Sequence, residues 1–157
     1  MIYIYVYNVF MIMNYDYQHG HCHYFANIII DEIRKLVPND FPINYYLILA
    51  ERHDDEGETI DDVLIHAYIK IGNYYLDSEG FHTIDDVNKR EQEWVDIEET
   101  LTPEDYSFNS YQEESENIPN YFFNRFCKRD TVKKDIKDFI SQPQFQDFIT
   151  KLHNKDR

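Results

Sequence analysis

The amino-acid sequence predicts an α+β domain in which one helix is followed by a small antiparallel sheet and then by further helices. An apolar stripe with helical spacing starts at Cys22, and apolar runs typical of strands occupy much of residues 43–77. Several short helical patterns follow towards the C-terminus. We expect residues 1–157 to form one domain, with a core over about 15–97 and a C-terminal helical extension over about 118–157.

The first expected helix begins at Cys22 and ends before Pro38, because proline cannot continue a helix. Its apolar residues are spaced by three or four and form one stripe, made of Cys22, Phe25, Ala26, Ile29, Ile33 and Leu36. Upstream, Ile2–Tyr7 alternates aliphatic residues with tyrosine, which favours a strand. A tightly packed aromatic helix running on to Met13 fits the same residues.

Three strands are expected after this helix, over Ile43–Glu51, Val63–Ile71 and Tyr74–Asp77. An acidic turn at His53–Thr59 separates the first strand from the second. The pair Gly72-Asn73 separates the second strand from the third, and it suits a tight two-residue hairpin. The three strands would therefore lie side by side in an antiparallel sheet.

Helices are expected again after the sheet. Thr83 and Asp86 have the spacing of a helix N-cap, so a helix is predicted over about Ile84–Val95. The polar and acidic segment 98–117 is predicted to be a long loop. Beyond it, short helical patterns occupy Pro119–Cys127, Thr131–Ile140 and Pro143–His153.

Composition restricts the class of function. Thirty acidic and 15 basic residues give a formal charge of −15, which repels phosphate backbones, so no direct nucleic-acid binding is expected. Two cysteines are too few for a disulfide framework, which favours a reducing, cytoplasmic compartment. The apolar segment Met1–Met13 has no Lys or Arg and is too short to cross a bilayer, so neither export nor membrane insertion is expected.

Cys22 is a candidate nucleophile because it lies where the first helix begins. A thiol attacks well when its surroundings favour the thiolate, and the unpaired amides and positive dipole end of a helix start do so. A buried structural cysteine is the alternative, since cysteine is among the most buried residue types. Cys127 has no base near it in the sequence and is expected to be structural.

His66 would supply a base for that thiol. It lies opposite to the apolar face of its strand, which is made of Val63, Ile65, Ala67, Ile69 and Ile71. If Gly72-Asn73 is a two-residue turn, His66 meets Glu79 directly, and Asp77 lies diagonally across from it on the same face. Either carboxylate is then placed to hold the imidazole in its useful tautomer.

A cysteine at a helix start, a histidine in a strand and an aspartate in the next strand resemble the papain-like and transglutaminase-like cysteine proteins. The likeness is greatest to small bacterial and phage members with a Gly-x-Cys-x-x-Phe-Ala helix and a His…Tyr-Tyr-Asp hairpin. It covers roughly residues 15–83, and its matching segments are Gly20–Ala26, His66–Ile69 and Tyr74–Gly80. The resemblance implies a papain-like core in which Cys22 is the nucleophile, His66 the base and Asp77 the orienting acid.

The resemblance also implies a glutamine that stabilises an oxyanion. Gln18 is the candidate, with the Cys22 amide as a second donor, although Gln18 precedes Cys22 by fewer residues than in papain-type proteases. The implied reaction is thiol-dependent acyl transfer on a protein or peptide substrate, with no cofactor. Hydrolysis of a peptide, amide, isopeptide or thioester bond is expected, because no acceptor site for an amine is apparent.

A metal site is a second interpretation, since His19, His21 and His23 surround Cys22. Neighbouring residues at a helix start point in different directions, however, so they do not easily converge on one ion. No metal is therefore expected. A set made of Cys22, His66 and Asp77 would be the better candidate if one were bound.

A non-enzymatic role is the third interpretation. A small acidic protein could inhibit a partner, or mimic nucleic acid, on a degenerate papain-like scaffold. The acidic runs Asp54–Glu58 and Glu113–Glu116 would then form the contact surface. Runs of charge are more often solvated loops.

Overall fold

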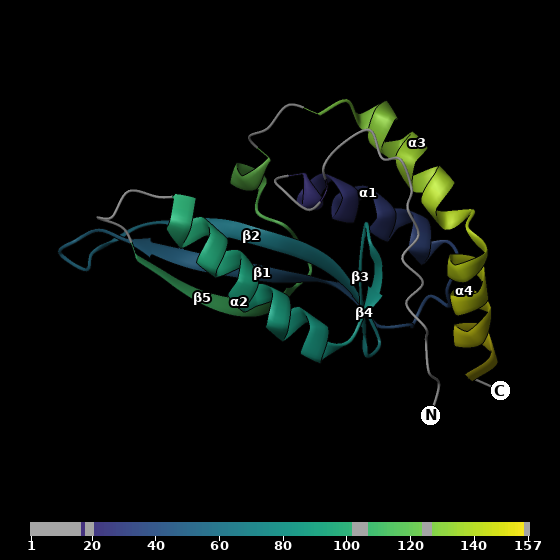
Figure 1. Cartoon of the computed structure of the whole chain (residues 1–157). Coiled ribbons are helices and arrows are strands. Elements are labelled where there is room, and N and C mark those ends of the chain that lie inside the picture. Colours follow the sequence, from purple (N-terminus) through teal and green to yellow (C-terminus); the bar gives the residue numbers. More distant parts are fainter. Residues whose placement is uncertain (1–16, 18–20, 102–106, 124–126, 156–157) are drawn as a thin grey trace.

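The computed structural model describes Tyr17 and residues 21–101, 107–123 and 127–155 (Figure 1). Within these residues the chain forms four α-helices, one short 3-10 helix and a five-stranded sheet. In chain order the elements are α1 (Cys22–Arg34), β1 (Ile43–His53), β2 (Thr59–Ile71), β3 (Tyr74–Asp77), β4 (Gly80–His82), α2 (Ile84–Leu101), β5 (Ser107–Ser115), η1 (Asn120–Phe122), α3 (Arg129–Ile140) and α4 (Pro143–Lys155).

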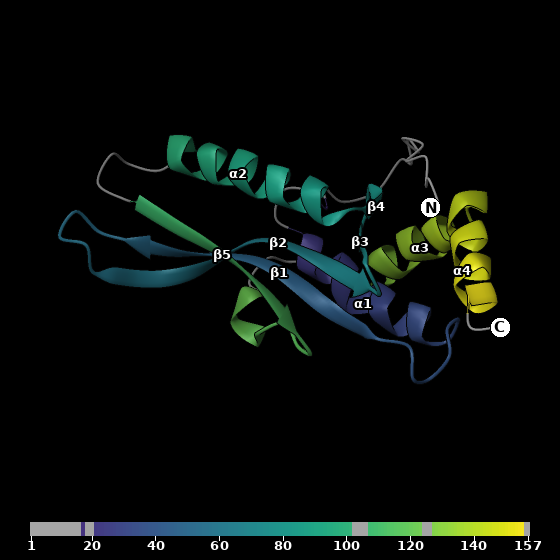
Figure 2. The same ribbon diagram turned by 90° about the horizontal axis from the view of Figure 1, so that it is seen from below.

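The sheet has the strand order β4-β3-β2-β1-β5, and each strand pairs antiparallel with its neighbours. Helix α2 covers one face, and α1 with α3 and α4 lies on the other (Figures 1 and 2). Each face has its own apolar cluster, the larger one on the side of α1 and the smaller one under α2. The predicted α+β class with an antiparallel sheet is therefore confirmed.

Helix α1 begins at Cys22 as predicted, and its apolar stripe packs on the sheet. Helices α3 and α4 add apolar residues to the same cluster, and the Tyr17 hydroxyl donates a 2.6 Å hydrogen bond to Asp135 on α3. The C-terminal helices thus share their core with the helix that carries the cysteine. The expected strand at Ile2–Tyr7 lies outside the described residues.

The β2–β3 hairpin has the predicted register, in which Ile71 pairs with Tyr74 and Ile69 with Leu76. Gly72 has a φ of 57°, the positive value that a type II′ turn requires at its first central position. The expected pairing of His66 with Glu79 is wrong, because the chain turns again after Asp77. It reverses into the short strand β4, in which Gly80 pairs with Asp77.

A β-bulge interrupts β2 just before His66. Ile48 of β1 pairs with His66 while the next residue, Leu49, pairs with Leu64, so Ile65 is an extra residue. As a result Leu64 packs in the cluster on the side of α1, and Ile65 packs in the cluster under α2. The predicted continuous apolar face of β2 is therefore wrong at these two residues, although it holds for Ala67, Ile69 and Ile71.

The predicted loop over 98–117 is also wrong. Helix α2 continues to Leu101, and residues 107–115 form β5, which pairs along nine residues of β1. This strand is an edge of the sheet and is mostly exposed, so its polar sequence lacks the apolar alternation of a half-buried strand. The helix predicted over Pro119–Cys127 is reduced, within the described residues, to the single turn of η1.

Within the described part of the chain, no helix has the length and apolar character needed to cross a bilayer.

Replacing Gly72 by alanine is expected to lower the free energy of unfolding by about 1 kcal/mol, because an L side chain disfavours positive φ. Its added methyl group would meet only Phe41 at 3.8 Å, so the loss comes from the backbone rather than from a clash. Urea denaturation measures it. Asn73→Ala, at a residue with ordinary φ in the same turn, should cost much less. Equal losses in the free energy of unfolding for the two variants would contradict a type II′ turn with positive φ at Gly72.

Candidate active site

Cys22 is the first residue of α1, and its side chain is buried. The carbonyl of His21 accepts hydrogen bonds from the amides of Tyr24 and Phe25, which starts the helix. The first turn carries no acidic residue. The positive end of the helix dipole therefore acts on the sulfur without competition from a carboxylate in that turn.

His66 lies in β2 directly after the bulge and is fully buried. Its ring packs against Trp94 of α2 with centroids 4.2 Å apart, and against Tyr68 at 4.7 Å. Nε2 of His66 lies 3.0 Å from Oδ2 of Asp77. Since Asp77 is ionised, this nitrogen carries the proton and donates it, which leaves Nδ1 for the thiol.

The start of α1 meets β2 beside His66. The ladder between β2 and β3 ends at Ile69, so no strand of the described residues pairs with β2 next to His66 on this side. Nδ1 of His66 is buried and has no hydrogen bond of ordinary geometry to any described residue. Cys22 is the group that interacts with this ring from the side of α1, both by charge and by hydrogen bonding.

The thiol and the imidazole change each other's protonation. Burial by itself would raise the pKa of Cys22, but the charge of His66 and hydrogen bonds from His23 and His66 lower it to about 6. Burial would likewise lower the pKa of His66, but the charge of Cys22 and the hydrogen bond to Asp77 raise it to about 9. Between these values the pair exists as thiolate and imidazolium.

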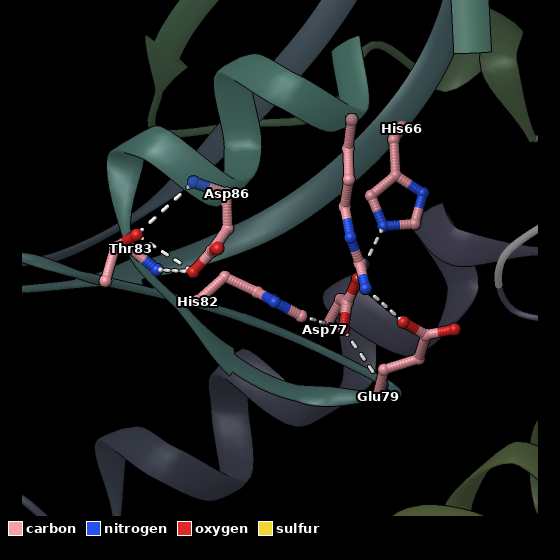
Figure 3. Close-up of polar contacts among 7 residues, drawn as sticks. His66, Asp77, Glu79, His82, Thr83 and Asp86 are labelled. Atoms are coloured by element: carbon pink, nitrogen blue, oxygen red, sulfur yellow. Dashed lines mark hydrogen bonds and ion pairs between the residues drawn. The ribbon is translucent and has the colours of Figure 1, made fainter. Parts of the chain in front are cut away.

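Asp77 is the last residue of β3, and its carboxylate is almost completely buried. Figure 3 shows the polar contacts around it. Oδ1 accepts hydrogen bonds from the Glu79 amide and from Nε2 of His82, both at 2.8 Å. Arg90 of α2 donates to Oδ2 at 3.3 Å. Burial would raise the pKa of Asp77, but the hydrogen bonds from His66 and His82 hold it far below its ordinary value.

Glu79 does not take the place that the sequence suggested. The turn that leads into β4 moves it away from direct pairing with His66, and its backbone amide binds Asp77 instead. Its side chain forms an ion pair with Arg90. Of the two carboxylates that were candidates to orient His66, Asp77 is the one that contacts the ring.

Sequence reasoning missed His82 and Arg90. The Thr83–Asp86 capping box was identified, and it is present: the Thr83 amide donates to Asp86 at 2.9 Å, and Thr83 Oγ1 accepts from the Asp86 amide at 3.3 Å. That box predicts where α2 starts. The missing information was the reversal into β4, which brings His82 back towards Asp77.

His23 is a further residue whose role sequence reasoning understated. It is 4% exposed, and its ring packs on Tyr24 and Phe123 with centroids 4.5 and 4.9 Å apart. Nε2 of His23 has no hydrogen-bond partner among the described residues. It contributes to the thiolate character of Cys22, as stated above.

The remaining sequence-based candidates divide into three cases. Gln18 and His19 lie outside the described residues. Among the residues that the structure describes, no three His, Cys, Asp or Glu side chains are grouped as a metal site requires. Cys127 is partly exposed, and burial raises its pKa, in contrast to Cys22.

The thiolate of Cys22 is expected to appear with a midpoint near pH 6, at the pKa of about 6 described above. Titrating its ultraviolet absorbance in a Cys127→Ser background measures this midpoint. His66→Leu removes the neighbouring positive charge but keeps the burial, so the midpoint should rise by several pH units. An unchanged midpoint in that variant would show that His66 does not act on the thiol.

Asp77→Asn is expected to lower the free energy of unfolding at pH 7 by about 3 kcal/mol, because it leaves buried donors without their carboxylate. The pKa of Asp77 is depressed by folding, so its stabilising contribution is present above about pH 4 and is lost as the pH falls towards the folded-state value. Urea denaturation between pH 7 and pH 3 should therefore show a shallower acid dependence for Asp77→Asn than for the parent protein. Parallel curves would contradict this.

Comparisons of the chain with protein-family models, with curated proteins and with solved structures found no match.

Proposed function

We propose that this protein is a thiol-dependent acyl-transfer enzyme that hydrolyses a peptide, amide, isopeptide or thioester bond. Cys22 is the nucleophile, His66 the general base and acid, and Asp77 the orienting carboxylate. The observation that carries the proposal is the buried group of three residues in which Cys22 interacts with His66, and Nε2 of His66 lies 3.0 Å from Oδ2 of Asp77. In agreement with this arrangement, the pKa values of Cys22 and His66 are shifted towards the charged forms. A cysteine and a histidine buried only for packing would be expected to stay neutral.

In the proposed reaction each of the three groups has one step. The Cys22 thiolate attacks the carbonyl carbon of the substrate, and a sulfur–carbon bond forms. The imidazolium of His66 gives its Nδ1 proton to the leaving amine or thiol as the bond to the carbonyl carbon breaks. His66 then takes a proton from water, which attacks the acyl-enzyme, and the released thiolate and acid complete the cycle.

Asp77 makes Nδ1 the nitrogen that transfers this proton. Its 3.0 Å hydrogen bond from Nε2 fixes the tautomer of His66, so Nδ1 is the nitrogen that exchanges protons with the sulfur and the substrate. The buried ring contact with Trp94 holds the imidazole plane. Both restraints reduce the reorganisation that the reaction needs.

Amides in the first turn of α1 are the groups proposed to stabilise the oxyanion. The backbone N–H of Cys22 lies at the positive end of the helix, where intrahelical acceptors are absent. Gln18 stays a proposed second donor from the resemblance. This assignment places the developing negative charge beside the nucleophile, as acyl transfer requires.

The arrangement also supports the papain-like interpretation of the fold. Cys22 begins a helix that packs on β2, His66 lies in β2, and Asp77 ends the adjacent antiparallel strand. The proposed substrate is a protein or peptide, because an acyl bond in a chain is the target that the resemblance implies. Two free thiols fit a reducing compartment, which would keep Cys22 active.

A non-enzymatic binding role is the second proposal. Residues 55–58 of the β1–β2 turn and Glu113 and Glu114 of β5 are exposed, so acidic surface is available for a basic partner. Binding of this kind would not depend on the thiol. Cys22→Ala therefore separates the two proposals, since it removes acyl transfer and leaves surface charge unchanged.

Reaction with p-nitrophenyl acetate is expected to give a burst of nitrophenolate and an acetyl group on Cys22, seen by intact-mass spectrometry and peptide mapping. Cys22→Ala should abolish both. His66→Ala should lower the burst rate by about 100-fold or more, which is the usual contribution of a general base. Asp77→Asn should lower it by a similar factor, because the tautomer is no longer fixed.

Cys127→Ser is the matched control and should react like the parent protein, since Cys127 has a raised pKa. Circular dichroism and thermal melting of each variant separate loss of reactivity from loss of fold. Equal acetylation of Cys22 and Cys127 in the folded protein would overturn the proposed function.

A further inference from the structure

The Asp77 carboxylate has more partners than orienting one imidazole requires. His66 binds Oδ2, while His82 binds Oδ1 through its own Nε2 at 2.8 Å. Arg90 donates to Oδ2, the same oxygen that His66 uses. Figure 3 shows His66 and His82 reaching Asp77 from separate elements.

The additional partners come from one continuous stretch of chain. The chain turns after Asp77 at Glu79, runs through β4 to His82, and enters α2 directly at the Thr83 capping box. Arg90 lies further along α2 and returns to the carboxylate, where it is also bound by Glu79. The stretch therefore contacts both oxygens of the carboxylate, Oδ1 through the Glu79 amide and His82, and Oδ2 through Arg90.

This arrangement restricts the carboxylate in orientation. A carboxylate held by one imidazole alone can rotate about its χ2 torsion, which is a broad and soft degree of freedom. Bonds to Oδ1 from β4 and from the turn amide oppose that rotation. Oδ2 is then held towards the ring of His66.

The negative charge of the Asp77 carboxylate interacts with Arg90 as well as with His66. A guanidinium 3.3 Å from Oδ2 attracts that oxygen and repels an imidazolium bound to it. Both effects make it easier for His66 to release its proton. A general acid must release a proton in each cycle. A carboxylate whose charge acted on His66 alone, without Arg90, would hold the proton of the imidazolium too strongly.

We propose that His82 and Arg90 are positioning residues of the acyl-transfer site, which fix Asp77 towards His66 and limit how strongly it retains the proton on that ring. The proposal rests on the proposed function and adds two residues to it. Neither residue contacts the sulfur in the described geometry. Both act through Asp77.

The groups that face Asp77 define what a pH measurement reports. They are His66 and Tyr68 from β2, Glu79 from the turn, His82 from β4 and Arg90 from α2. Cys22 acts on Asp77 indirectly, through His66. Tyr68 stays neutral over the measured range, because burial and the charge of Asp77 raise its pKa.

The test is the pH dependence of Cys22 alkylation by iodoacetamide, in a Cys127→Ser background. The rate should rise in two steps, the first when the thiolate forms and the second when His66 loses its proton, near pH 9. Arg90→Met removes the charge beside Asp77 and should move the second step upward by about 0.5 pH unit or more. Arg90→Lys, which keeps the charge, should move it less.

Lys89→Met is the matched control for Arg90→Met. Lys89 is the neighbouring residue on α2, is 78% exposed, and pairs with Glu93 at 3.9 Å. The Lys89→Met substitution makes the same change in net charge as Arg90→Met, at a residue that has no contact with Asp77 in the described structure. The second step should therefore stay where it is in the parent protein.

His82 is tested through orientation rather than charge. His82→Leu removes the bond to Oδ1 and should lower the rate of the p-nitrophenyl acetate burst by about tenfold or more. The pH midpoint for thiolate formation at Cys22 should stay unchanged. His82→Gln places an amide donor near the position of Nε2 and should restore most of the rate. A purely structural role would give losses that follow the melting temperature and no rescue by glutamine.

The outcomes separate this inference from the proposed function. If His66→Leu leaves Cys22 alkylation unchanged, the thiol–imidazole pair is absent and both proposals fail. If that pair is present but Arg90→Met and Lys89→Met give the same profile, and His82→Gln does not rescue, the inference fails and the proposed function stands. The inference is supported if Arg90→Met shifts the pH step at which His66 loses its proton and His82→Gln restores the burst rate.

Discussion

The burial of an ionised carboxylate is the constraint around which this site is built. A charge as buried as that of Asp77 is tolerated only when protein groups replace the water it has lost. Those groups are supplied by β2, by the turn after β3, by β4 and by α2. The short strand β4 contributes little to the core apart from Phe81, so its clearest contribution is to place His82. The path of the chain between β3 and α2 therefore follows from solvating one side chain.

The same burial determines the character of the thiol. A cysteine this deep in apolar surroundings is normally harder to ionise than a free one. Here the positive charge of His66, the contact with His23 and the start of α1 act in the opposite direction and prevail. The negative sulfur and the positive ring stabilise one another, and Asp77 stabilises the ring. Removing one member changes the protonation of the other two, so the three residues behave as one titrating unit.

The parts of the structure that local pattern controls could be predicted from the sequence. The start of α1 at Cys22, the hairpin at Gly72 and the cap of α2 at Thr83 each depend on neighbouring residues, and all three are present. The contact between His66 and Asp77 followed from the hairpin register. Features that depend on distant partners were missed: β5 is polar because it is a sheet edge, and the reversal at Glu79 is stabilised by Arg90 from α2. The bulge at Ile65 follows the pairing with β1, which no local pattern in β2 reveals.

That bulge also separates β2 into two parts with different tolerance for change. Between the bulge and Gly72 the strand pairs with β3 over Ile69–Ile71, and this part places His66 relative to Asp77. Beyond the bulge, β2 and β1 continue as an arm towards the acidic turn. A bulge is itself an extra residue absorbed without loss of pairing on either side. Insertions or deletions in the arm would thus alter its length and its acidic surface while leaving the histidine in place, so the arm can diversify in sequence independently of the chemistry.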